Sequence, residues 1–175
     1  MERARAVTLP LLVMLASSLC VAGCAKPQPP SVSIGTAQLT RPAPADLESP
    51  KSAVVSYLDW TSYAYLVGNS DVASTTMSAK EEVRVDSYVQ LNKEQQRRIS
   101  QVLVTFKPRA ANIEGTRATL GADESWEYRY LSADGSRAIS ETYTASYETT
   151  YNVVLIRPKT WIVDSVEARA LGEVK

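Results

Sequence analysis

The sequence predicts an α+β domain in which three N-terminal helices pack on a strongly curved, cone-like antiparallel sheet. Two observations carry this prediction. Between residues 50 and about 91, apolar side chains recur with the spacing of helices that bury one side. After Ser100 the repeat changes to two, as in strands with one buried face. A run of helices followed by a run of strands is typical of the α+β class.

The first helix is expected over residues 51–67. Ser49 is suited to cap it, and Pro50 suits the first helical position, where no backbone N–H is needed. Gly68 is expected to end it, because glycine adopts the left-handed backbone of a C-terminal cap without strain. Apolar residues cover most of its surface, which indicates a helix largely enclosed by other elements.

Two further helices are expected before the sheet. Asp71 is a candidate cap for a short second helix. Ser78 and Glu81 have the spacing of a capping box that would begin the third helix. Residues 93–100 either continue this third helix or follow a bend, and the sequence leaves both alternatives open.

The first strand is expected to follow Ser100. Val102, Val104 and Phe106 alternate with their neighbours, so these three side chains are predicted to form its apolar face. Pro108 is expected to end the strand, because proline has no N–H to donate to a neighbouring strand.

Longer strands are expected after it. Even positions of residues 117–130 and odd positions of residues 139–155 carry most of the apolar and aromatic side chains. Asp134-Gly135 marks a tight turn between these two segments, and residues 161–166 supply the last strand. Strands of this length must twist and bend to enclose a core, so a curved sheet is expected.

The N-terminal segment has the features of an export signal. Arg3 and Arg5 precede an apolar run that ends in Val21-Ala22-Gly23-Cys24. This tetrapeptide resembles the lipobox of bacterial lipoproteins. The alternative is an uncleaved transmembrane anchor, which Pro10 disfavours because proline weakens a spanning helix.

The lipobox resemblance implies that the signal is removed and that the thiol of Cys24 carries diacylglycerol. Two acyl chains hold a protein firmly, at about 0.8 kcal/mol per buried methylene. The protein is therefore expected on the extracytoplasmic face of the membrane. By the same resemblance, Ala25 in place of aspartate does not favour inner-membrane retention, so the outer membrane is expected where one exists.

The chain is therefore expected to have three parts. Residues 1–23 form the cleaved signal peptide, residues 24–49 the lipidated cysteine with a linker, and residues 50–175 the cone-like domain. Five prolines among small and polar residues make the linker a semi-extended spacer. The remaining length is enough for one domain with its own core.

Composition excludes several classes of function. The chain has no histidine, which excludes Ser–His–Asp and Cys–His catalysis and histidine-ligated zinc. Its two cysteines are Cys20, in the signal, and Cys24, so no metal site and no cofactor are expected in the domain. After signal removal, 17 basic and 18 acidic residues remain. This balance offers no positive excess, and nucleic acid is not expected as a partner.

The order of elements resembles the nuclear transport factor two superfamily, also called SnoaL-like or cystatin-like cones. The resemblance covers about residues 50–168 and rests on three segments: the helix from Ser49, the strand around Glu124-Ser125-Trp126, and the closing strand at residues 160–166. It implies a pocket between sheet and helices, and a homodimer formed through the open sheet face. The aspartate–histidine pair of its isomerase and dehydratase members has no counterpart here.

Glu124 is the candidate for acid–base chemistry. Strand alternation places it on the same face as Trp126 and Tyr128, which are expected to point inward. A carboxyl group in such surroundings has a raised pKa, closer to the range useful for proton transfer. The alternative is a structural role, either near a bend or in an ion pair with an arginine such as Arg84.

Aromatic residues supply the candidates for a ligand or partner pocket. Tyrosine and tryptophan offer large contact areas with a polar tip, which suits both ligand stacking and interfaces. The alternative is that they only furnish the core and the sheet surface. The candidate pocket residues are Tyr57, Tyr65, Trp126, Tyr128 and Tyr147.

Two functions follow from these observations. The first is a membrane-anchored extracytoplasmic lipoprotein whose domain binds an envelope protein or a small ligand. The second is a carboxylate-dependent enzyme, like an isomerase or dehydratase, with its pocket around Glu124. The lack of histidine and of a free thiol favours the first function, so a non-enzymatic role is expected.

Overall fold

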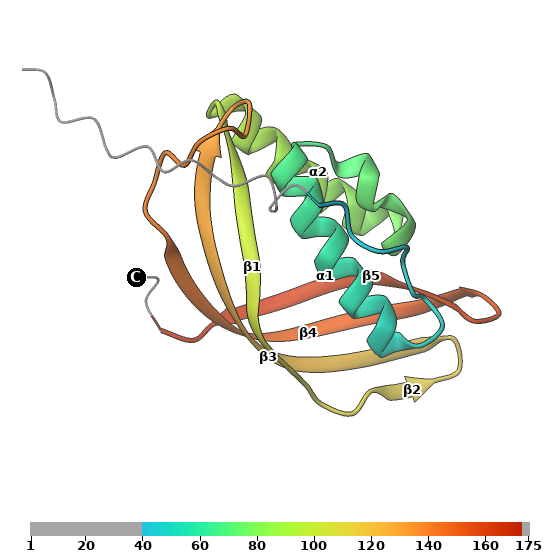
Figure 1. Cartoon of the computed structure of the whole chain (residues 1–175). Coiled ribbons are helices and arrows are strands. Elements are labelled where there is room, and N and C mark those ends of the chain that lie inside the picture. The colour runs from blue at the N-terminus through green and yellow to red at the C-terminus, as the bar shows by residue number, and fades with distance from the viewer. Residues whose placement is uncertain (1–39, 173–175) are drawn as a thin grey trace, which may run out of the picture.

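A computed structural model of the chain describes residues 40–172 (Figure 1). Three helices come first and a five-stranded antiparallel sheet follows, so the predicted α+β class and the order of its elements are confirmed. The helices are α1 (Pro50–Val67), the 3₁₀ helix η2 (Ser70–Thr76) and α2 (Ala79–Glu94). The strands are β1 (Arg97–Pro108), β2 (Asn112–Glu114), β3 (Arg117–Ser132), β4 (Tyr143–Arg157) and β5 (Thr160–Ala170).

Helix α1 has the caps that its sequence predicts. The Ser49 hydroxyl accepts a hydrogen bond from the Ser52 N–H at 3.1 Å, and the Ser52 hydroxyl accepts one from the Ser49 N–H at 3.1 Å. Gly68 ends the helix with φ 68° and ψ 37°, in the left-handed region that glycine tolerates.

The caps of the next two helices match the sequence in part. Asn69, and not Asp71, caps η2, because the Asn69 side chain accepts a hydrogen bond from the Asp71 N–H at 3.1 Å. Ser78 caps α2 as predicted. The side chain of Glu81 does not complete the capping box, since it turns into the protein interior.

After α2 the chain bends and enters the sheet. The helix ends at Glu94, and Gln96 takes a positive φ of 55° in the turn that leads to β1 at Arg97. Of the two alternatives for residues 93–100, the bend is therefore the one present.

The sheet has the order β1-β3-β4-β5, and the short β2 also pairs with β3. The alternation predicted for the central strands β3 and β4 is confirmed, because even positions of β3 and odd positions of β4 point into the protein. The buried residues that follow it are Ala118, Leu120, Ala122, Glu124, Trp126, Ala145, Thr149, Tyr151 and Val153. Near the end of β3 the alternation fails, because Leu131, at an odd position, is fully buried.

The face predicted for β1 is wrong over its first half. Val102 and Val104 are 55% and 56% exposed, while Ile99 is buried and Leu103 packs against the core. A β-bulge between Leu103 and Thr105 shifts the register and returns Phe106 to the core side. Strand β1 is an edge strand, with β3 as its neighbour in the sheet.

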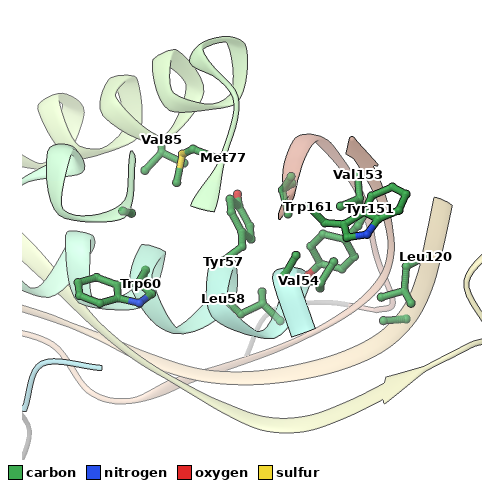
Figure 2. Close-up of a cluster of buried hydrophobic side chains, with 14 of the residues drawn as sticks. Val54, Tyr57, Leu58, Trp60, Met77, Val85, Leu120, Tyr151, Val153 and Trp161 are labelled. Atoms are coloured by element: carbon green, nitrogen blue, oxygen red, sulfur yellow. The ribbon is translucent and has the colours of Figure 1, made fainter. Parts of the chain in front are cut away.

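The core lies between the helices and one face of the sheet (Figures 1 and 2). Tyr151 is the largest of the side chains that are fully buried, and the ring of Tyr57 meets it edge-on with centroids 6.3 Å apart. Figure 2 shows the cluster that joins the two layers, whose labelled members are Val54, Tyr57, Leu58, Trp60, Met77, Val85, Leu120, Tyr151, Val153 and Trp161.

The segment before α1 lies against the domain. Ala45 and Leu47, which fall within the predicted linker, pack on the core. The backbone N–H of Trp161 donates to the Leu47 carbonyl at 2.8 Å, and the backbone N–H of Asp46 donates to the Ser56 hydroxyl at 2.9 Å. In the described part of the chain, no helix combines the length and the apolar character needed to cross a membrane.

Candidate functional site

The carboxylate of Glu124 lies in the interior, and both of its oxygens accept hydrogen bonds. Tyr151, on the neighbouring strand β4, donates its O–H to Oε1. Trp126, two residues along β3, donates its indole N–H to Oε2 at 2.9 Å. Glu124 is 6% exposed. Its buried carboxyl group is therefore surrounded by protein, with two neutral side chains as hydrogen-bond donors.

The surroundings of Glu124 move its pKa in the direction expected from the sequence. Burial raises the pKa of Glu124, and the hydrogen bonds from Tyr151 and Trp126 act in the opposite direction. Burial and the nearby Glu124 also raise the pKa of Tyr151, which keeps its hydroxyl protonated as the donor. The suggested ion pair between Glu124 and Arg84 is not formed, because Arg84 binds another carboxylate.

That second carboxylate is Glu81, in α2. The Arg84 Nε lies 2.9 and 3.0 Å from the two Glu81 oxygens, and the Tyr57 O–H donates to Glu81 Oε1 at 2.5 Å. The Glu81 side chain is 3% exposed, whereas that of Arg84 is 53% exposed. Tyr57, predicted as a pocket residue, therefore acts as a core donor that ties α1 to α2.

Tyr65 also packs between the two helices. Its ring meets the Tyr88 ring of α2 edge-on, with centroids 5.3 Å apart. Burial raises the pKa of Tyr65 to about 12. Tyr65 lines an open hollow of about 300 Å³ together with Arg84, Ser87, Tyr88 and Leu91.

The other three predicted pocket residues do come together. Trp126, Tyr128 and Tyr147 line one hollow of about 150 Å³ on the face of the sheet that points to α2. Tyr88 of α2 lines the same hollow. Trp126, Tyr128 and Tyr147 are thus neighbours on adjacent strands, whereas Tyr57 and Tyr65 do not line their hollow.

A larger cavity, of about 470 Å³, lies between α1 and β1 and is called the edge groove here. Its walls come from three places: the segment before α1, one side of α1, and the start of β1 with Trp126 behind it. The lining residues are Thr40, Pro42, Leu58, Asp59, Ser62, Tyr63, Leu66, Ser100, Gln101, Val102, Leu103 and Trp126.

The edge groove is mainly apolar, with a few polar groups. The side-chain amide of Gln101 donates to the Ser62 hydroxyl at 2.9 Å, which joins the strand wall to the helix wall. Asp59 is the one charged residue among those that line the groove, and within residues 40–172 no cation forms an ion pair with it. Burial raises the pKa of Asp59.

Sequence reasoning missed most of this groove. Of the residues that line it, only Trp126 was a predicted pocket residue. Leu58 and Leu66 have the pattern of ordinary core residues, and Asp59 has that of a solvated position. Only the placement of β1 beside α1 turns them into the walls of one cavity.

The described residues hold no arrangement suited to a metal ion. Within residues 40–172, no three His, Cys, Asp or Glu side chains gather into such a group. Cys24, the predicted lipidation site, lies outside the described residues.

Comparisons with known proteins bear on the fold. No known protein-family profile matches this chain, and no curated protein matches it. Among solved structures, it is similar to the intermembrane space region of chloroplast protein ARC6, with a TM-score of 0.55 and 12% sequence identity. The match covers 74% of this chain and 100% of that one. At this identity the chain shares a fold with that region, and the likeness extends no further.

Proposed function

We propose that this chain is a lipid-anchored extracytoplasmic lipoprotein whose single cone-like domain is a non-enzymatic binding module. The edge groove is the observation that carries the binding part. Its volume of about 470 Å³ is within the usual range for ligand sites, and its apolar walls hold a few polar groups, as such sites do. The anchoring part rests on the lipobox-like tetrapeptide that ends at Cys24.

The cone-like description is supported by the strand lengths and by the layering. Strands β3 and β4 have 16 and 15 residues, and long strands bend as they twist. Both α-helices lie on one face of the sheet (Figure 1). The similar solved structure is an intermembrane space region, so a domain of this fold is known from a compartment between membranes.

Catalysis at Glu124 has less support than binding. Both of its oxygens already accept hydrogen bonds, and Glu124 lines none of the cavities described above. A general acid or base must reach the proton that it transfers. The buried cluster around Glu124 therefore supports a structural role.

Self-association through the outer face of the sheet belongs to the same proposal. The exposed Ile156 of β4, at an even position of a strand whose odd positions are buried, offers apolar contact area for a second copy. Sedimentation of the full chain in detergent should give the mass of a dimer, and a monomeric mass at all concentrations would remove this part of the proposal.

Lipid attachment is tested by labelling cells with an alkyne analogue of palmitate. The wild type should be labelled and should partition with membranes, whereas Cys24→Ala should be unlabelled and either released or left unprocessed. Cys20→Ala is the matched control, because Cys20 is expected to leave with the signal and its loss should change nothing. Labelling of Cys24→Ala would overturn the anchoring part.

Groove binding is tested by photocrosslinking in intact cells. A benzophenone amino acid replaces Tyr63, which lines the edge groove, or Tyr88, which is an exposed tyrosine outside it. Irradiation should give a discrete adduct from position 63 and none from position 88. No adduct at position 63, or equal adducts at both positions, would overturn the assignment of this groove.

A further inference from the structure

The edge groove runs along the free edge of β1. Four consecutive residues, Ser100 to Leu103, line it. Side chains of successive strand residues point to opposite faces, so a cavity over one face would be lined by every second residue. A cavity lined by four residues in a row must instead open along the edge of the strand. Figure 1 shows β1 at the margin of the sheet, with α1 alongside it.

This edge of β1 is unpaired in the part of the chain that the structure describes. Within residues 40–172, β1 pairs with β3 on one side, and no other strand pairs with its second side. Alternate residues of an edge strand therefore direct their N–H and C=O groups outward, ready to pair with another chain.

The part of this edge that lines the groove carries none of the usual protection against such pairing. Natural edge strands carry charges, proline or bulges, and β1 has Arg97 and Arg98 at its start, a bulge after Leu103, and Lys107 and Pro108 at its end. Residues 100–103 lie between these features and contain neither a charge nor a proline. Val102 and Val104 are both more than half exposed beside the groove. An uncharged edge with exposed valines is suited to a partner strand.

We propose that the edge groove binds an extended peptide segment of a partner protein, which adds to β1 as a further strand. This inference deepens the proposed binding function and rests on it. Main-chain hydrogen bonds to β1 would hold the segment, and α1 would cover one of its faces. Residues 100–103 span about 13 Å at about 3.3 Å per residue, so the contact suits about four to six residues of peptide.

The side chains of the groove define the peptide further. Residues of the segment that face α1, every second one, would meet Leu58, Leu66 and the ring of Trp126, which favours apolar side chains. Asp59 lies on the same wall without a cationic partner among residues 40–172. The preferred segment therefore has apolar residues and one lysine or arginine on the face that meets the helix.

A designed peptide provides the probe. It is a fluorescein-labelled hexapeptide with threonine at its odd positions, valine at positions two and six, and lysine at position four. Binding to the full chain in detergent is followed by fluorescence anisotropy. Two N-methylated versions, one methylated at odd and one at even positions, remove the N–H groups along one edge or the other.

Strand addition predicts different effects of the two methylation patterns. Methylation along the peptide edge that faces β1 should weaken binding more than about tenfold, because several hydrogen bonds are lost together. Methylation along the opposite edge should change the affinity less than about threefold. Hydrogen exchange should slow at the outward amides of β1. Equal effects of both patterns, or no saturable binding of the parent peptide, would overturn the proposal.

Variants of the protein test the proposed contact between Asp59 and the lysine of the peptide. Asp59→Asn should weaken binding of the lysine peptide about threefold to fivefold and leave a norleucine version unchanged, as for a partly exposed ion pair. Glu94→Gln, at the exposed end of α2, is the matched control and should bind as the wild type does. An equal loss for the lysine and norleucine peptides in Asp59→Asn would contradict the charge pairing.

Two other occupants of the β1 edge would give different patterns of hydrogen exchange. Slow exchange of the outward β1 amides before any peptide is added, at every protein concentration, would mean that the chain preceding Thr40 already pairs there. The same protection appearing only as concentration rises would mean a second copy. Either result would overturn a partner peptide as the occupant. A photoadduct at position 63 with failed peptide binding would leave the proposed function intact and remove this inference alone.

Discussion

Two carboxylates near Trp126 have different surroundings. Glu124 is buried and accepts hydrogen bonds from the Trp126 indole and from Tyr151. Asp59 lies in the edge groove, which the same indole lines, and has no cationic partner within residues 40–172. Burial raises the pKa of both groups. A raised pKa therefore does not by itself mark a functional site.

What separates the two carboxylates is hydrogen bonding and access. A buried polar group whose partners are all in place stabilises one arrangement of the core. Asp59 is exposed and has no ion-pair partner within residues 40–172, so it is available to a ligand. Variants of Glu124, Arg84 and Asp59 test this division between the two carboxylates.

Removal of the Glu124 carboxyl group should have the largest effect on stability. Glu124→Ala leaves the Tyr151 hydroxyl and the Trp126 N–H without an acceptor and opens a small cavity beside them. The free energy of unfolding should fall by about 2–4 kcal/mol. Denaturant titration of the intact chain measures it. A loss below about 1 kcal/mol would show that the cluster is not a structural one.

Loss of the Arg84 guanidinium extends the comparison to the other buried carboxylate. Arg84→Ala leaves Glu81 buried with Tyr57 as its remaining donor. Because half of Arg84 is exposed, the expected cost is about 1–3 kcal/mol, below that of breaking a fully buried ion pair. Arg169→Ala removes an exposed partner of Glu148 and serves as the control, with an expected cost under about 0.5 kcal/mol. Equal losses in the two variants would contradict the assignment.

The pH dependence of unfolding tests the environment of Glu124 directly. Since its pKa is raised above the ordinary 4.5, the native state holds the proton more tightly than the unfolded chain does. The contribution of Glu124 to the free energy of unfolding is therefore largest when the pH is below 4.5. This contribution is lost as the pH rises through the raised pKa of the native state. The wild type should therefore lose stability relative to Glu124→Gln as the pH rises above 4.5. If the stability of the wild type and of Glu124→Gln changed with pH in the same way, the pKa of Glu124 would not be raised by folding.

The smallest effect is expected in the groove. Asp59→Asn keeps the shape of the side chain and breaks no ion pair, so the free energy of unfolding should change by less than about 0.5 kcal/mol. Thermal unfolding next to the wild type is a sufficient measurement. A loss comparable to that of Glu124→Ala would mean that Asp59 is part of the core, and the contrast between the two carboxylates would disappear.

Local signals in the sequence predicted much of the fold. The caps of α1 at Ser49 and Gly68 depend on residues a few positions apart, and they form as expected. The alternation in β3 and β4 runs over many residues, so their buried face is unambiguous. At η2 two capping residues stand close together, and local chemistry did not distinguish Asn69 from Asp71.

The face of β1 and the edge groove depend on tertiary structure. Both faces of β1 carry apolar residues, Val102 and Val104 on one and Ile99 and Leu103 on the other, so alternation alone does not identify the buried face. The groove needs β1 to be an edge strand and to lie beside α1. Neither fact can be predicted from the residues that form the walls of the groove.

The position of Trp126 gives the protein an internal optical reporter. Its indole N–H is fixed by Glu124, while its ring lines the groove, so a molecule that displaces water from the groove changes the polarity around the ring. The chain has three tryptophans, and the other two, Trp60 and Trp161, do not line the groove. With phenylalanine at both of those positions, the emission comes from Trp126 alone and responds to a molecule in the edge groove or in the neighbouring hollow that Trp126 also lines, so an unlabelled partner becomes detectable by a blue shift.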